Sequence, residues 1–385
     1  MIPYGRQEIT QADIDAVVET LRSDFLTQGP QVPAFEQAVA DYCRATHAVA
    51  VNSGTSALHL ACKALDLKPG GLLWTTPITF VASANCALYC GADVDFVDID
   101  PATGNMSIEA LQTKLEQADK AGRLPNIVVP VHFAGLPCDM ASIAALSSRY
   151  GFRVIEDACH AIGARYSTGP VGNCRFSDIT IFSFHPVKLV TTAEGGMAVT
   201  NDSRLADRMR LLRSHGITRN PDQMSRTPDG PWYYEQIDLG FNYRLTDIQA
   251  ALGQSQLHRL DDYILRRHEL AMRYDQHIAH LPLRPLGRQI DGRSALHLYV
   301  VRLDTTESPL SRGQLFDRLR EAGIGVNVHY IPVHTQPHYQ EMGFQPGDFP
   351  KAERYYREAL TLPLSPGLTE AQQDTVIQAL TRALS

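Results

Sequence analysis

The chain has 385 residues, of which 44% are hydrophobic and 20% are charged, a composition typical of soluble globular proteins with one large or two ordinary domains. Its formal net charge of −7 and its pI near 6.0 argue against a general affinity for nucleic acid or for anionic membranes. We therefore expect small ligands or protein partners.

The seven cysteines are scattered along the chain and include no C-x-x-C pair. This pattern indicates reduced, mostly buried thiols, and we expect a cytoplasmic protein. Cys86 and Cys90 would share a helix face, but no nearby cluster of histidines or cysteines offers a complete zinc site. We therefore predict no bound metal.

The sequence predicts no membrane-spanning segment. The first ten residues lack the apolar core of a signal peptide. The uncharged run 69–92 is long enough to cross a bilayer, but it contains Pro77, Asn85 and several hydroxyl side chains. This mixture is typical of a strand, a turn at Pro77 and a buried helix.

Predicted strands and helices alternate through the first half of the chain. Such alternation indicates parallel βαβ units, with helices on both faces of a sheet and with ligands at the carboxyl ends of the strands. The predicted helices are 10–21, 32–43, 57–65, 108–117 and 140–150, and the predicted strands are 47–51, 72–75, 94–99, 127–131, 153–156 and 179–184.

The turn after the first of these strands has the composition of an anion site. Residues 52–58 read N-S-G-T-S-A-L and lead into a helix, whose free backbone N–H groups and positive dipole end attract anions. Gly54 lets the backbone approach a ligand closely, while Thr55 and Ser56 add hydroxyl donors. The alternative is ordinary helix capping, which needs no ligand.

Asp157 closes a predicted buried strand. A carboxylate in such a place is unfavourable unless a cation or a strong hydrogen-bond donor pairs with it. It either caps the segment that follows or partners a protonated ring nitrogen of a ligand.

Lys188 differs from the other five lysines, which lie among charged residues. Between Asp178 and Glu194 the only other ionisable side chain is His185, and residues 179–184 are typical of a strand buried on both faces. An amine there is partly desolvated, which lowers its pKa and lets it attack a carbonyl as a neutral nucleophile. The alternative is a lysine that extends from an apolar patch into water.

These three features together are what pyridoxal phosphate (PLP) requires. Lys188 would form the Schiff base, Asp157 would keep the pyridine nitrogen protonated, and the turn 52–58 would hold the phosphate. Because all three follow strands, they converge on one edge of the sheet. The sequence therefore predicts PLP as the cofactor.

The second half of the chain predicts a smaller domain. Residues 214–235 lack an apolar period and predict a long loop, after which a helical stretch runs from 247 to about 280. Beyond it we expect a strand at 296–303, helices at 312–322 and 370–384, and a segment at 326–329. We predict a large PLP-binding domain at 10–250 and a small domain at 251–385 that also includes residues 1–9.

Six motifs occur in order along the chain: N-S-G-T-S-A-L (52–58), P-I-T-F-V-A-S (77–83), E-D-A-C-H-A-I-G-A (156–164), F-S-F-H-P-V-K (182–188), E-G-G (194–196) and G-F-N-Y-R-L-T-D-I-Q-A (240–250). With them the chain resembles, over essentially its whole length, the sugar-nucleotide aminotransferases of the DegT/DnrJ/EryC1/StrS family. The resemblance implies an α/β protein of fold type I, with a mostly parallel central sheet sandwiched by helices and a smaller C-terminal α/β domain.

The resemblance also implies roles for single residues. Lys188 matches the Schiff-base lysine and Asp157 the partner of the pyridine nitrogen, while His160 would lie beside the ring. Asn242 matches the residue that reaches the phosphate of the partner subunit, so a homodimer with shared active sites is expected. The remaining positions that match cofactor contacts are Gly54, Thr55, Ser56 and Ser183 at the phosphate and Phe80 against the ring face.

Within the family the chain resembles the pseudaminic-acid branch, through I-P-Y-G-R-Q (2–7), W-T-T-P-I-T-F (74–80) and V-N-V-H-Y-I-P-V-H (326–334). That branch aminates a UDP-linked 4-keto-6-deoxy sugar, and glutamate is the family's usual amino donor. The resemblance makes Tyr4, Arg6, His329 and Tyr330 the expected substrate contacts. For the tyrosines, the alternative is packing between the N-terminus and the C-terminal domain.

Other functions stay open beside this one. The acceptor is either the L-arabino 4-keto sugar of that branch, its D-xylo epimer or a dTDP-linked sugar. The family's sugar dehydratases replace the lysine with histidine, whereas Lys188 is present here. A non-catalytic regulator would usually carry an added DNA-binding segment, and the sequence predicts none.

Overall fold

The structure is a computed structural model that describes residues 1–287 and 292–384. Its centre is a seven-stranded sheet in the order β2-β10-β9-β6-β5-β3-β4. In this sheet β10 is antiparallel to both neighbours and the other strands are parallel, which confirms the predicted α/β architecture. The strands are β2 (His47–Val51), β3 (Leu72–Thr75), β4 (Asp93–Phe96), β5 (Ile127–Val128), β6 (Arg153–Asp157), β9 (Ile179–Ser183) and β10 (Gly196–Thr200).

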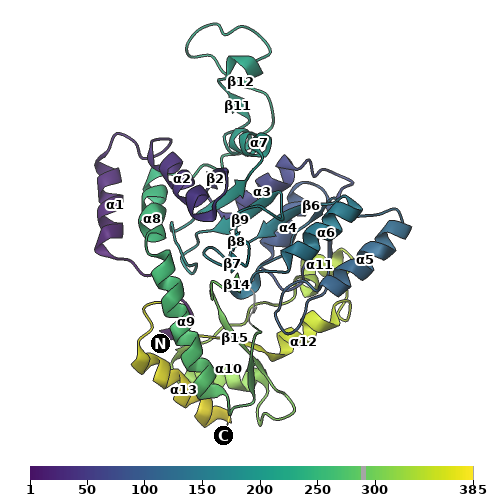
Figure 1. Ribbon diagram of the computed structural model, residues 1–385, viewed down its shortest axis with the longest axis vertical. Coiled ribbons are helices and arrows are strands. Elements are labelled where there is room, and N and C mark those ends of the chain that lie inside the picture. Colours follow the sequence, from purple (N-terminus) through teal and green to yellow (C-terminus); the bar gives the residue numbers. More distant parts are fainter. Residues whose placement is uncertain (288–291, 385) are drawn as a thin grey trace.

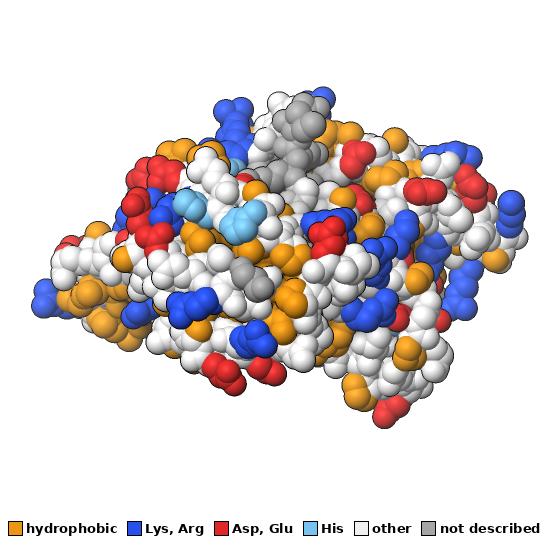
Figure 2. Space-filling model, turned by 90° about the horizontal axis from the view of Figure 1, so that it is seen from below, with side chains coloured by type: hydrophobic (Ala, Val, Ile, Leu, Met, Phe, Trp, Pro, Cys, Tyr) orange, Lys and Arg blue, Asp and Glu red, His pale blue; other side chains and the backbone are white. Residues whose placement is uncertain are grey.

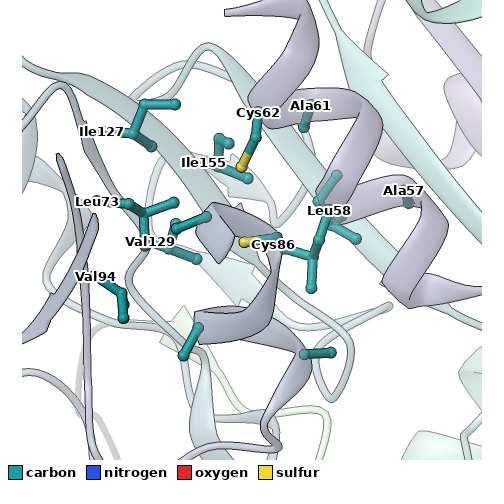
Figure 3. Close-up of a cluster of buried hydrophobic side chains, with 14 of the residues drawn as sticks. Ala57, Leu58, Ala61, Cys62, Leu73, Cys86, Val94, Ile127, Val129 and Ile155 are labelled. Carbon is teal, nitrogen blue, oxygen red and sulfur yellow. The ribbon is translucent and has the colours of Figure 1, made fainter. Parts of the chain in front are cut away.

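Both faces of the sheet are buried under helices, as Figure 1 shows. Consecutive residues of β6 illustrate this, since Val154 belongs to one hydrophobic cluster and Ile155 to another. Figure 3 shows the second cluster, where side chains of α3 and α4 pack against the sheet. The helices of this part are α1 (Gln11–Arg22), α2 (Gln31–Cys43), α3 (Gly54–Ala64), α4 (Ala82–Tyr89), α5 (Ile108–Lys120), α6 (Met140–Tyr150), α7 (Ser203–Arg213) and α8 (Asp247–Leu257).

The C-terminal part has its own hydrophobic cluster and an antiparallel sheet in the order β13-β15-β17. β1 (Ile2–Pro3) pairs in parallel with β16 (Ile324–Gly325), so the first residues of the chain join this part. A domain boundary near residue 250 stays a prediction. The other elements here are α9 (Leu260–Ile278), β13 (Leu283–Pro285), β15 (Tyr299–Leu303), α10 (Arg312–Glu321), α11 (Pro337–Glu341), α12 (Pro350–Glu358), β17 (Ala359–Leu362) and α13 (Glu370–Leu384).

Several elements differ from their predicted bounds. α3 begins at Gly54 rather than at residue 57, because the Ser53 side chain caps it by accepting a hydrogen bond from the Ser56 backbone N at 3.1 Å. β5 is two residues long, and Pro130, which has no N–H group, lies just beyond it. The helical stretch after residue 246 is two helices, α8 and α9, and β15 begins at Tyr299 rather than at residue 296.

The predicted loop 214–235 forms an arm that extends away from the body beyond α7, at the top of Figure 1. A short hairpin of β11 (Ile217–Thr218) and β12 (Glu235–Gln236) forms its base. Trp232 on this arm and Leu239, which follows the arm, are 72% and 74% exposed.

A small sheet of β14 (Gly292–Arg293), β7 (Arg165–Tyr166) and β8 (Gly169–Pro170) completes the described strands. Among the described residues, no helix has the length and apolar character needed to cross a membrane. On the face shown in Figure 2, acidic and basic side chains are interspersed rather than gathered by sign.

Candidate active site

A cavity of about 610 Å³ collects most of the residues predicted from the sequence. It lies where the chain leaves β2, β6 and β9, at the carboxyl ends of three strands that run in one direction. The predicted residues in its lining are Gly54, Thr55, Phe80, Asp157, His160, Ser183, Lys188, Tyr4, His329 and Tyr330.

Lys188 lies in the turn after β9, where its backbone N donates to the carbonyl of His185 at 2.9 Å. Its side chain lines the cavity, and the residue is half-buried. Burial lowers the pKa of Lys188, while Cys159 and Asp157 oppose part of that shift. The amine is therefore more often neutral, and more nucleophilic, than an exposed lysine at the same pH.

Asp157 ends β6 and is 5% exposed. One carboxylate oxygen accepts from the Ser83 hydroxyl at 2.5 Å, and the other accepts from the Cys159 backbone N at 3.1 Å. Thr79 lies 2.6 Å from the Ser83 hydroxyl and extends this chain of hydrogen bonds. These bonds fix the carboxylate, and no arginine or lysine ion pair to it occurs among the described residues. It is suited to a cationic donor from a ligand.

The N-terminus of α3 forms a close-fitting edge of the cavity, where Ser53, Gly54 and Thr55 line it. A Cβ atom added to Gly54 would come within 3.0 Å of the Ser183 Cβ and 3.2 Å of its hydroxyl. Only glycine lets the two segments approach this closely. Free N–H groups of the first helical turn beside a hydroxyl fit a phosphate.

Phe80 lines the cavity and is 60% exposed, so its ring is open to contact with another flat group. Together with the desolvated amine, the fixed carboxylate and the edge formed by α3, this arrangement fits the parts of PLP. The residues present therefore meet the requirements that the sequence predicted.

Three predicted residues do not line the cavity. The Ser56 hydroxyl donates to the Asn52 side chain at 2.6 Å, which commits it to the turn. Asn242 is exposed, and its carbonyl accepts from the Asn52 amide at 3.4 Å; Arg6 is exposed near the N-terminus. Their roles at the phosphate, in the partner subunit and at the substrate stay predictions.

One wall of the cavity consists of imidazole and phenol groups. His160 Nε2 lies 3.1 Å from the Tyr330 hydroxyl, and His329 Nδ1 lies 2.8 Å from the Thr361 hydroxyl. Burial, together with Lys188, lowers the pKa of His160 well below its ordinary value and that of His329 to about 3, while burial raises the pKa of Tyr330. These side chains are therefore uncharged at neutral pH.

Several lining residues were not predicted from the sequence. Ser53, Thr79 and Ser83 lie within motifs that the sequence analysis named, so the hydroxyl spacing carried a signal. His297 lies in an apolar run that resembles a strand and carried none. The other polar lining residues that were not predicted are Cys159, His185, Glu194 and Asn327.

A second groove, of about 1060 Å³, runs along the edge strand β4 and holds none of the predicted residues. The polar groups of this edge already have partners, because the Asp95 side chain accepts from the Phe96 backbone N at 2.7 Å and Lys114 donates to the Phe96 carbonyl at 2.6 Å. Such bonds protect an edge strand from pairing with another chain.

The model of the DegT/DnrJ/EryC1/StrS aminotransferase family matches residues 7–381. The chain belongs to this family. It is 41% identical over 383 residues to the spore coat polysaccharide biosynthesis protein SpsC of Bacillus subtilis, covering 98% of this chain and 96% of SpsC.

Solved structures agree with the family assignment. The chain is 30% identical to Helicobacter pylori PseC, an aminotransferase involved in pseudaminic acid biosynthesis, with a TM-score of 0.90 over 100% of this chain and 99% of that one. The same values hold for the PMP form of the putative sugar aminotransferase Spr1654 of Streptococcus pneumoniae, and its PLP form is 29% identical with a TM-score of 0.88 over 100% of both chains. The chain is therefore a PLP-dependent sugar aminotransferase of the DegT/DnrJ/EryC1/StrS family, as the sequence predicted.

Proposed function

We propose that this aminotransferase moves an amino group from glutamate to C4 of a UDP-linked 4-keto-6-deoxy-N-acetylhexosamine, as in pseudaminic acid biosynthesis. The observation that carries amino transfer at this cavity is Lys188, a desolvated amine that shares the cavity with the fixed carboxylate of Asp157. The choice of sugar is supported by the N-terminal and 326–334 motifs and by the likeness to PseC.

Each predicted residue would hold one part of the cofactor. Lys188 would carry it covalently, Asp157 would face its ring nitrogen, and the N–H groups at Gly54 and Thr55 would bind its phosphate beside Ser183. When bound, PLP supplies an aldehyde carbon that takes the amino group from the donor and gives it to the acceptor, and a ring that accepts electrons.

Lys188 has a second task once its amine is free. Because burial lowers its pKa, the Lys188 amine gives up a proton more readily than an exposed lysine does, which suits it to accept and return the proton that the exchange between the two substrates requires. The Asp157 carboxylate is already oriented by Ser83 and Cys159, and it would stabilise a positive charge on the ring nitrogen of the cofactor.

The uncharged wall of Tyr4, His329 and Tyr330 would hold the sugar. Phenol and imidazole groups offer donors and acceptors without a charge, which suits hydroxyl, acetamido and keto groups. The diphosphate binds away from the reacting carbon, and that binding energy positions C4. Arg6 lies two residues after Tyr4 in the sequence, and we propose that it contacts the nucleotide.

The test is a panel of nucleotide-linked 4-keto sugars incubated with the enzyme and glutamate, with products identified by mass and NMR. We expect the highest kcat/KM for UDP-linked 2-acetamido-2,6-dideoxy-L-arabino-hexos-4-ulose, with the 4-amino-L-altrose sugar as product. A higher kcat/KM for the D-xylo epimer or a dTDP sugar would overturn the choice of acceptor and leave the enzyme class standing.

One relative of the chain is named for a different polysaccharide. SpsC, at 41% identity, is described by its role in spore coat polysaccharide synthesis rather than by pseudaminic acid. The D-xylo epimer and dTDP sugars therefore belong in the panel as full alternatives.

A further inference from the structure

His297 lines the cavity beside His160, although no sequence motif singled it out. It precedes β15, is 4% exposed, and its ring centroid lies 4.4 Å from that of His160 with 46° between the ring planes. We refer to these two side chains as the imidazole pair.

The backbone of His297 is fixed from two sides. Residues 295 and 298 donate to the carbonyls of 135 and 134 at 2.9 and 3.3 Å. Arg267 on α9 donates to the carbonyls of Leu296 and His297 at 3.2 and 3.1 Å, and it is 2% exposed. A buried guanidinium is uncommon, and here it fixes the backbone that carries His297 and also donates to the Leu364 carbonyl at 3.1 Å.

The imidazole pair has unmet hydrogen-bonding atoms. Nδ1 of His160 and Nδ1 of His297 are both buried and have no hydrogen-bond partner among the residues that the structure describes, whereas Nε2 of His160 lies 3.1 Å from the Tyr330 hydroxyl. Buried polar atoms without partners are rare and need an explanation. A phenylalanine at position 297 could pack on His160 without burying an unpaired nitrogen. We therefore infer that a ring nitrogen of His297 has a function.

The tautomer of His160 decides what Tyr330 can do. Burial lowers the pKa of both histidines, so each ring is neutral, with one N–H and one bare nitrogen. If His160 carries its hydrogen on Nε2, it donates to the Tyr330 oxygen, and the Tyr330 O–H is free to donate into the cavity. If the hydrogen is on Nδ1, Tyr330 must donate to His160, and the cavity loses this donor.

We propose that His297 is a positioning residue that selects the first tautomer: its Nδ1–H donates to Nδ1 of His160, His160 donates to Tyr330, and Tyr330 donates to the acceptor sugar. The two ring centroids lie 4.4 Å apart, and the first bond requires the rings to turn from their present orientation, in which neither Nδ1 has a partner among the described residues. The proposal rests on amino transfer in this cavity and not on the choice of sugar.

The direct test is NMR of the holoenzyme with ¹⁵N-labelled histidine, in which the His160 signals are assigned by their loss in His160→Gln. We expect the Nε2–H tautomer in the wild type and a shift toward Nδ1–H in His297→Phe. An Nδ1–H tautomer in the wild type, or an unchanged tautomer in His297→Phe, would overturn the proposal. This measurement needs no substrate, so it stands apart from any failure of the proposed function.

A double-mutant cycle tests the consequence for turnover. His297→Phe should lower kcat/KM by about tenfold, the effect of one neutral hydrogen bond, and should have no further effect in a Tyr330→Phe background. His297→Asn places an amide N–H near the Nδ1 position, so its kcat/KM should be close to that of the wild type. If His297→Phe does not fold, the proposal is tested in His297→Asn, where His160 should keep the Nε2–H tautomer; an Nδ1–H tautomer there would overturn it.

The matched control is His334→Phe, which removes a buried histidine outside the cavity; its Nδ1 has no partner among the described residues, and its Nε2 lies 3.0 Å from Glu353 Oε1. It should leave kcat/KM of the folded enzyme unchanged. Equal losses from His297→Phe in the wild-type and Tyr330→Phe backgrounds would show that His297 does not act through Tyr330.

Discussion

Glu156 and Asp157 are neighbours on β6 but serve different purposes, because side chains alternate across a strand. Asp157 faces the cavity, whereas Glu156 is 1% exposed and bonds to His132 Nε2 at 2.8 Å and to Ser177 and Tyr166. Burial alone would raise the pKa of Glu156, but its bond with His132 lowers it. Glu156 is therefore a charged structural group, whereas the Asp157 carboxylate is accessible to a ligand in the cavity.

Substituting the two carboxylates separately tests this difference. Asp157→Asn should lower kcat by at least about a hundredfold with little change in thermal midpoint, because a preoriented charge at the ring nitrogen is lost. Glu156→Gln, the matched control, should cost about 3 kcal/mol of unfolding free energy while kcat per folded enzyme is kept. Near-normal turnover in Asp157→Asn would remove its role at the cofactor.

At the scale of elements, the first turn of α3 controls how closely a phosphate can approach. Gly54→Ala would place a Cβ 3.0 Å from the Ser183 Cβ, so β9 and α3 must separate. We expect the Kd for PLP to rise about tenfold, the cost of one or two weakened hydrogen bonds, as measured by fluorescence titration of the apoenzyme.

Gly313 on α10 is the control for that change, since it also lies in a first helical turn and its nearest neighbour is 3.9 Å from an added Cβ. Gly313→Ala should leave the Kd unchanged and stabilise the fold slightly. If Gly54→Ala binds PLP as tightly as Gly313→Ala does, the phosphate does not lie at this turn.

Helices and strands with a clear hydrophobic periodicity were predictable from the sequence. The convergence of the carboxyl ends of the strands on one site was predictable as well. α6 and α13 have the predicted bounds, and the carboxyl ends of β2, β6 and β9 bring residues 53–55, Asp157 and Lys188 to one cavity. Local patterns do not encode distant partners. The bond from Ser83 to Asp157 spans 74 positions, and the segment before β15 pairs with residues 134–135, so His297 was not predictable.

At the scale of the whole molecule, one predicted cofactor contact, Asn242, does not line the cavity of its own chain. Asn242 is exposed, and Trp232 on the arm and Leu239 after it are exposed as well. A second copy of the chain would cover these residues and receive Asn242 at its phosphate. We propose that the catalytic unit is such a homodimer.

Complementation between inactive variants tests the shared site. Lys188→Ala and Asn242→Ala should each be severely impaired alone, but a hybrid dimer would have one site with both residues intact. Random exchange makes half of the dimers hybrid, so about a quarter of wild-type activity should return. Hybrid dimers that form, as shown by mass, but stay inactive would mean that each site is built from one chain.

Covalent trapping of the cofactor tests the assignment of this cavity most directly. The enzyme is loaded with PLP, reduced with borohydride, digested and mapped by mass spectrometry. The label should lie on the peptide that contains Lys188 and should be absent from Lys188→Ala. A label on any of the other five lysines, or one that persists in Lys188→Ala, would contradict the assignment of Lys188 as the cofactor-binding amine.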